Sequence, residues 1–171
     1  MADQFKWAVS ALATRTVLPQ FFADNLPIVE IVDSTTITAD QLRWFRDSTS
    51  GIFNYGDPIS TQSFDQHTAG ILYWEGRVGA LINLPEDGWY LVSVRAQHTP
   101  PAPVILQLEA DLQPFGKLEL QRSDLSWEVF PFKVYLEKGV HLLDVNYLNN
   151  EIVNEIDRNA VIEWINLEEA R

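Results

Sequence analysis

The fold of this chain is decided by residues 140–167, which read VHLLDVNYLNNEIVNEIDRNAVIEWINL. The first eight residues, 140–147, have the pattern of a β-strand, and the strand is followed by Asn149 and Asn150. Residues 161–167 again alternate apolar and polar side chains. The polar, acid-rich residues between these two strands are therefore predicted to form a loop at one rim of a β-fold.

The rest of the chain repeats strand patterns that are separated by glycine and proline. These turn residues recur from Gly51 to Gly139 at the spacing expected for a sandwich or jelly roll. Residues 38–45 predict one short helix, capped by Thr38. The clearest predicted strands are residues 28–33, 77–84, 89–96, 104–110, 128–136, 140–147 and 160–167. We expect one all-β domain over residues 28–171, an antiparallel β-sandwich of the jelly-roll type.

Residues 1–27 differ from this strand-rich remainder. Phe5, Ala8, Val9 and Leu12 recur at helical spacing, which predicts a short helical N-terminal extension. Such a helix can pack on the surface of its own domain. Alternatively, it can serve as an assembly element that docks on a neighbouring subunit or on a longer parent chain, giving a homo-oligomer or a larger assembly.

The composition limits the partners of this protein. Its 171 residues include 24 acidic and 12 basic side chains, a formal net charge of −12. Because nucleic acids and anionic membrane surfaces repel such a chain, we expect no nucleic-acid partner. No apolar run reaches the roughly 20 residues that span a bilayer, so we expect no membrane insertion. The absence of cysteine excludes disulfides, zinc–thiolate sites and thiol catalysis.

Several segments together resemble one known family. The rim has the order of a strand, the pair Asn149-Asn150, a short insert, the triplet Asp157-Arg158-Asn159 and a last strand with an acid. This order resembles the calcium-dependent xylan-binding type of carbohydrate-binding module. Residues 88–96, GWYLVSVRA, and 138–142, KGVHL, are similar to two further segments of that family. The resemblance covers roughly residues 28–168, and its specific part is the last thirty residues.

Three positions depart from the family pattern. Asn150 stands where the family usually has aspartate, which removes one charged ligand from the expected calcium site. Ala160 replaces a leucine, and Glu163 replaces an aspartate with a longer carboxylate arm. The resemblance also implies an extracellular or cell-surface location, whereas Asp3 and a single lysine make the N-terminus a poor signal peptide.

The resemblance implies a calcium ion bound by the rim loop. Calcium takes several oxygen ligands at once from carboxylates, amide side chains and carbonyl groups. The candidate ligands are Asp157, Asn159, Asn149, Asn150 and Glu155. In the family, a calcium at the rim meets sugar hydroxyls directly. The alternative is that Asp157 and Asn159 cap a turn while Arg158 forms an ion pair.

Related modules often hold a second, structural calcium between an acid on the first strand and an acid on the last strand. Glu30 and Glu163 stand at plausible positions for that site. A carboxylate buried there would need a partner or a metal, and the alternative is that either side chain points into solvent.

Sugar binding also requires an aromatic platform, because the C–H face of a pyranose stacks on Trp or Tyr. Residues 51–57, GIFNYGD, resemble the aromatic–Asn–Gly region of the family near its binding rim. The candidate ligand-binding residues are Tyr55, Asn54, Asp57, Arg158 and Trp127. The alternative for each aromatic residue is packing in the core or on the surface.

An enzymatic function finds little support in the sequence. His67, His98 and His141 are isolated, and the chain has no nucleophile elbow, phosphate-binding loop or dinucleotide motif. We therefore expect a non-catalytic carbohydrate-binding module that binds a neutral polysaccharide, with calcium at the rim. The alternative is a structural or assembly subunit that keeps the module fold, no longer binds sugar and docks through its N-terminal helix.

Overall fold

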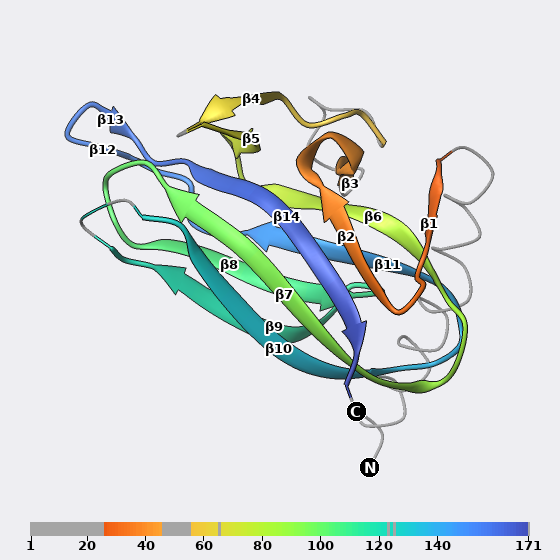
Figure 1. Cartoon of the computed structure of the whole chain (residues 1–171). Coiled ribbons are helices and arrows are strands. Elements are labelled where there is room, and N and C mark those ends of the chain that lie inside the picture. The colour runs from red at the N-terminus through yellow and green to blue at the C-terminus, as the bar shows by residue number, and fades with distance from the viewer. Residues whose placement is uncertain (1–25, 46–55, 65, 123, 125, 171) are drawn as a thin grey trace, which may run out of the picture.

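The chain forms a β-sandwich in a computed structural model that describes residues 26–45, 56–64, 66–122, 124 and 126–170 (Figure 1). Two six-stranded sheets, here called sheet A and sheet B, make the two layers, and a two-stranded hairpin extends from one end. The predicted β-sandwich is confirmed. The predicted helical extension over residues 1–27 lies outside the described residues, apart from its last two positions.

Sheet A has the strand order β1-β6-β11-β8-β9, and β3 also pairs with β6. The short β1 runs parallel to β6, whereas the other pairs are antiparallel. Its strands are β1 (Ile28–Glu30), β3 (Arg43–Phe45), β6 (Gly76–Leu84), β8 (Val104–Ala110), β9 (Gln113–Leu120) and β11 (Gly139–Tyr147).

Sheet B has the order β10-β7-β14-β5-β4, and β2 also pairs with β14. Its strands are β2 (Ser34–Thr38), β4 (Thr61–Phe64), β5 (His67–Leu72), β7 (Gly88–His98), β10 (Glu128–Leu136) and β14 (Ala160–Glu169). The last strand, β14, is central because β7 pairs along one edge and β5 and β2 share the other. A register shift between Ile162 and Trp164 interrupts its alternation, so that Ile165 and Leu167 join Ile162 in the core.

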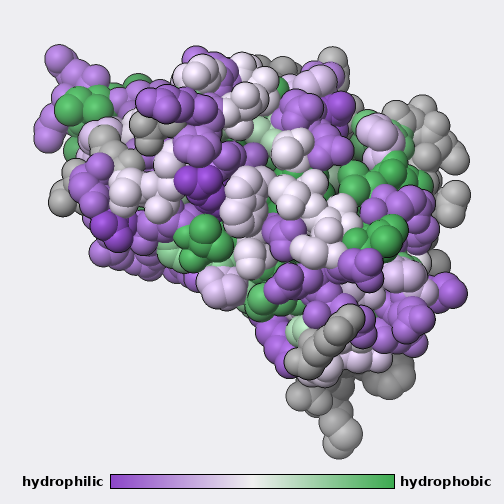
Figure 2. All heavy atoms as spheres, viewed as in Figure 1, coloured by the Kyte–Doolittle hydropathy of each residue, from purple (hydrophilic) through white to green (hydrophobic). Residues whose placement is uncertain are grey.

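A hairpin of β12 (Ile152–Val153) and β13 (Ile156–Asp157) projects between β11 and β14. Its two turn residues, Asn154 and Glu155, have φ values of 51° and 67°, which is the conformation of a tight two-residue hairpin turn. Figure 2 shows a hydrophobic spot on this projecting hairpin among hydrophilic neighbours. The exposed hydrophobic side chains there are Ile152 and Ile156, at 69% and 52% exposure.

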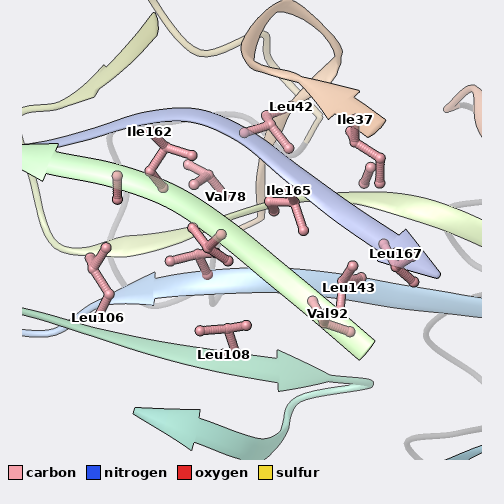
Figure 3. Close-up of a cluster of buried hydrophobic side chains, with 14 of the residues drawn as sticks. Ile37, Leu42, Val78, Val92, Leu106, Leu108, Leu143, Ile162, Ile165 and Leu167 are labelled. Atoms are coloured by element: carbon pink, nitrogen blue, oxygen red, sulfur yellow. The ribbon is translucent and has the colours of Figure 1, made fainter. Parts of the chain in front are cut away.

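The core lies between the two sheets and takes side chains from both (Figure 3). Residues alternate along the strands, so Leu143, Val145 and Tyr147 of β11 face Val92 and Val94 of β7 across the interior. All five side chains are wholly or almost wholly buried. The alternating patterns that predicted the strands are therefore the patterns that build this core.

The predicted helix over residues 38–45 is wrong in its length. Thr38 does cap one turn of 3-10 helix, η1 (Ala39–Gln41), and its backbone N–H donates to the Gln41 side chain at 3.0 Å. The chain then becomes extended, because Leu42 and Trp44 alternate with Arg43 and enter the core. Among the described residues, no helix is long and apolar enough to cross a membrane. Six further strands among the described residues were also missed: β2, β4, β5, β9, β12 and β13.

The burial of β14 predicts a large difference between two isoleucines. Replacing Ile162, which is fully buried, by alanine should lower the free energy of unfolding by about 2–5 kcal/mol, since it leaves a cavity between the sheets. The matched change Ile152→Ala, on the exposed hairpin, should alter it by about 0.5 kcal/mol or less. Urea unfolding of both variants measures this difference, and equal losses would contradict the assigned core.

Candidate functional site

Two loops build one end of the sandwich. Residues 99–103 connect β7 to β8, and residues 148–159, which include the β12–β13 hairpin, connect β11 to β14. Figure 1 shows both loops at the end where β7 finishes and β14 begins. We call these two loops the rim.

Arg158 joins the two loops of the rim from the inside. Its side chain is buried, and the guanidinium Nε donates to the Pro101 carbonyl at 3.0 Å while Nη1 donates to the Asn149 carbonyl at 3.1 Å. Its backbone N–H donates to the Glu151 carbonyl at 3.1 Å, and the exposed Glu151 carboxylate lies 3.7 Å from Nη1. A planar, permanently charged group that reaches two carbonyls at once acts as a clamp.

Tyr147 supports this clamp from the core. The phenol donates its O–H to the Arg158 carbonyl at 2.7 Å, and its Oη lies 3.4 Å from Oδ1 of Asn150. Burial raises the pKa of Tyr147, so the phenol keeps the proton that it donates. The end of β11 is thereby tied to the start of β14.

Thr99 holds the last residues of the rim in place. Its hydroxyl accepts from the Asn159 N–H at 3.0 Å and donates to the Asp157 carbonyl at 3.3 Å. Its own N–H donates to the Asn159 carbonyl at 3.0 Å. Asn159 is buried, and its side-chain amide lies 3.4 Å from the Asp157 carbonyl. The Asp-Arg-Asn triplet is thus fixed largely through backbone atoms.

Asn149 has a structural contact at each end of its amide. Oδ1 accepts from the Ile105 N–H at 2.7 Å, and Nδ2 donates to the Pro103 carbonyl at 2.9 Å. These contacts attach the rim to the first residues of β8. A metal ion could take the Asn149 oxygen only in competition with the Ile105 N–H.

The other predicted ligands of the rim calcium are less buried. Asp157 and Glu155 are exposed, and Asn150 is half-buried, with its Oδ1 3.4 Å from the Tyr147 hydroxyl. These three side chains offer oxygen atoms, which are the ligands that calcium prefers. Within the described residues, no three acidic or histidine side chains are already gathered closely enough to hold a metal ion.

The structure does not bring Glu30 and Glu163 together. Glu30 lies on β1 of sheet A, where its carboxylate accepts from the Asn83 side chain at 2.8 Å. Glu163 lies on β14 of sheet B, 2.6 Å from Arg95 Nη1 and 2.8 Å from His67 Nδ1. The two carboxylates project from the outer faces of different sheets, and each has its own protein partner.

Trp127 belongs to a cluster on the outer face of sheet B. The Arg95 guanidinium lies over its ring at 5.2 Å, and the His67 and Phe64 rings meet it edge-on at 5.6 and 6.2 Å. No sequence motif predicted these contacts of Trp127. Phe64, His67 and Arg95 come from different strands and are brought together only by strand pairing.

Asp57, another predicted ligand-binding residue, is part of neither rim loop. Asp57 lies beside β3 in sheet A, where its carbonyl accepts from the Trp44 N–H at 2.9 Å. Tyr55 and Asn54 lie outside the described residues.

Solved structures with the same arrangement of strands include carbohydrate-binding modules. A family 36 module of a multidomain xylanase from the hindgut metagenome of Trinervitermes trinervoides superposes with a TM-score of 0.56 at 14% identity, covering 81% of this chain and 99% of the module. The C-terminal family 6 module of a laminarinase from Zobellia galactanivorans gives 0.56 at 14% identity, covering 80% and 100%. The chain has the fold of a carbohydrate-binding module.

A family 36 module in complex with calcium and xylotriose is also similar, with a TM-score of 0.54 at 11% identity, covering 78% of this chain and 99% of that one. The fold is not restricted to such modules, because part of an insecticidal delta-endotoxin from Bacillus thuringiensis gives 0.60 at 11% identity over 83% of this chain and 25% of its own. The sequence matches no protein-family model and no curated protein. At these identities the similarity establishes the fold, and the function has to be argued from the rim.

The two hydrogen bonds of the Arg158 guanidinium predict that this residue stabilises the fold. Arg158→Gln should lower the free energy of unfolding by at least about 2 kcal/mol, because two hydrogen bonds from a charged donor are lost in a buried place. The matched change Arg122→Gln, at an exposed ion pair with Asp124, should leave the melting temperature unchanged. Thermal unfolding of both variants measures the difference. An unchanged melting temperature for Arg158→Gln would show that Arg158 does not stabilise the rim.

Proposed function

We propose that this protein is a non-catalytic carbohydrate-binding module whose rim binds a neutral polysaccharide together with a calcium ion. The observation that carries the proposal is a rim fixed from the inside by Arg158, with the acid side chains of Asp157 and Glu155 on its outside. A preorganised polar loop loses little conformational entropy when it binds a ligand. The net charge of −12 disfavours acidic polysaccharides, which leaves a neutral one.

Calcium fits the chemistry of the donors on the outer rim. Asp157, Glu155 and Asn150 would hold the ion through carboxylate and amide oxygens, with rim carbonyl groups completing the set. A bound calcium ion would supply open coordination positions for sugar hydroxyl oxygens. Because Asn150 is neutral, the set carries one negative charge fewer than an aspartate would give, and calcium affinity decreases when a charged ligand is lost.

The aromatic part of the proposed site is assigned to Tyr55 and Asn54, which precede Asp57 in the sequence. Trp127 is a weaker candidate for stacking, since the Arg95 guanidinium covers one side of its ring. Arg158 contributes by holding the loop, because its buried guanidinium points to carbonyl groups of the protein.

The hairpin favours a second candidate, a structural or assembly subunit. Ile152 and Ile156 expose 69% and 52% of their surface on a segment that projects from the sandwich. Aliphatic side chains offer nothing to sugar hydroxyls, whereas they bury readily against another protein. In that case the hairpin, together with the predicted N-terminal helix, would contact a partner subunit.

Calorimetric titration distinguishes these two candidates. Calcium is titrated into chelator-treated protein, and xylan or mannan oligosaccharides follow with and without the metal. The module is supported by sugar binding that requires calcium. The assembly subunit is supported instead if neither titration releases or absorbs heat and light scattering gives a molar mass above that of the monomer.

Removing the carboxylate of Asp157 should abolish the stabilisation of the protein by calcium. In the unchanged protein, calcium at 100 times its dissociation constant should raise the free energy of unfolding by about 2.7 kcal/mol. Asp157→Ala should lose this increment and keep its fold in the absence of calcium, because the side chain is exposed.

The control is Glu119→Ala, which removes the same charge from the exposed edge strand β9. Differential scanning calorimetry with calcium and with chelator measures both variants. If calcium still stabilises Asp157→Ala, Asp157 is not a ligand of the calcium ion.

A further inference from the structure

Asp144 is a carboxyl group buried without a hydrogen-bond donor. It lies on β11 between Leu143 and Val145, which face the core, so its own side chain points to the outer face of sheet A. Its exposure is 0%, and neither carboxylate oxygen accepts a hydrogen bond from an N–H or O–H group of the described residues. A charged carboxylate in such a place would lose its hydration with nothing in return.

The neighbour of Asp144 across the strands is a second buried acid, Glu109. β8 and β11 pair so that Asp144 stands opposite Glu109, which is 1% exposed. Glu109 takes the donors of this region: Arg77 Nε at 2.7 Å, the Gln107 amide at 2.7 Å and the Asn146 amide at 3.1 Å. Glu109 is therefore the member of the pair whose negative charge is compensated.

The other charges near Asp144 do not compensate it. Asp111, in the β8–β9 turn, adds a second negative charge, and its carboxylate is engaged by His141 Nδ1 at 2.7 Å and by the Leu142 N–H at 2.9 Å. Arg43 lies across β6 from Asp144, and its Nη1 donates hydrogen bonds to the carbonyls of Asp40 and Leu42. Among the described residues, Arg77 is thus the cation of this cluster, and it pairs with Glu109.

Close packing leaves little room for the carboxyl group to move away. Gly79 stands opposite Asp144 on β6, and a Cβ atom there would collide with the Leu143 carbonyl oxygen and lie 2.7 Å from the Asp144 Cα and Cβ atoms. Buried on all sides, the pair cannot serve as a substrate site. A proton between the two carboxyl groups removes both the repulsion and the uncompensated charge.

We propose that Asp144 is held as a neutral carboxylic acid that donates its O–H to Glu109, and that this shared proton makes the fold less stable as the pH rises. Burial, together with the charge of Glu109, raises the pKa of Asp144 well above its ordinary value, and Arg77 opposes this only in part. The shared proton between Asp144 and Glu109 lies on the outer face of sheet A, and the proposal does not depend on what the rim binds.

The direction of the pH effect follows from the two states. Below a pH of about 4, Asp144 is protonated in both the folded and the unfolded chain, and its contribution is fully present. Above that pH the unfolded chain releases the proton while the folded protein retains it. The unfolding equilibrium constant therefore rises about tenfold per pH unit until Asp144 ionises in the folded protein.

The test compares the protein with Asp144→Asn, whose amide N–H can donate to Glu109 at every pH. The unfolding constant of the unchanged protein, divided by that of Asp144→Asn, should rise about tenfold per pH unit from pH 5 upward in urea titrations. A constant loss of stability in the variant does not affect this slope. Asp124→Asn, at an exposed acid whose pKa the Arg122 side chain lowers, should give a flat ratio over the same range.

Carbon-13 spectra of the carboxyl groups test the same proposal without a variant that has to be stable. The Asp144 carboxyl carbon should keep the shift of a protonated acid at pH 6, where exposed aspartates have already ionised. A flat ratio for Asp144→Asn, or an Asp144 signal that titrates near pH 4, would overturn the proposal. The proposal is also overturned if metal analysis finds one bound cation per protein and chelation removes both this cation and stability. In that case the cation, and not a proton, compensates the charge of Asp144.

Discussion

The rest of the structure depends on the pairing of β14 along both of its edges. The strand runs through the middle of sheet B, with β7 on one side and β5 and β2 on the other. Its inward side chains, Ile162, Ile165 and Leu167, are buried against sheet A. Since Ala160 already belongs to the strand, the preceding Arg158 and Asn159 have little freedom, and the position of the rim follows from that of the core.

The rim combines a rigid interior with a polar exterior. Inside, Arg158 and Thr99 bind carbonyl and N–H groups, so the loop conformation does not require a ligand. Outside, Asp157 and Glu155 extend into solvent. A loop held in this way can change its outer side chains while its shape is kept. The fold itself occurs in proteins as different as a family 36 module and a delta-endotoxin.

The two sheets hold their acids in two different ways. The half-buried Glu163 forms an ion pair with Arg95 and also contacts His67 Nδ1 on the outer face of sheet B. In sheet A, one arginine serves two neighbouring acids, Glu109 and Asp144, so only one of them can be compensated as an anion. The difference lies in the number of acids that strand pairing places beside one arginine: among the described residues, Glu163 has Arg95 to itself, whereas Glu109 and Asp144 lie beside Arg77.

By itself, the sequence determined the all-β class, most of the long strands and the polar loop between residues 147 and 160, because alternation with period two requires only local information. It could not show the register shift after Ile162, nor the short strands β2, β4 and β5, whose residues are selected by their neighbours in the sheet. It also left open whether Arg158 points outward or inward. The tertiary structure decided that point, since the Pro101 and Asn149 carbonyls that bind its guanidinium come from opposite sides of the rim. Contacts between residues tens of positions apart exist only once the sheets have formed.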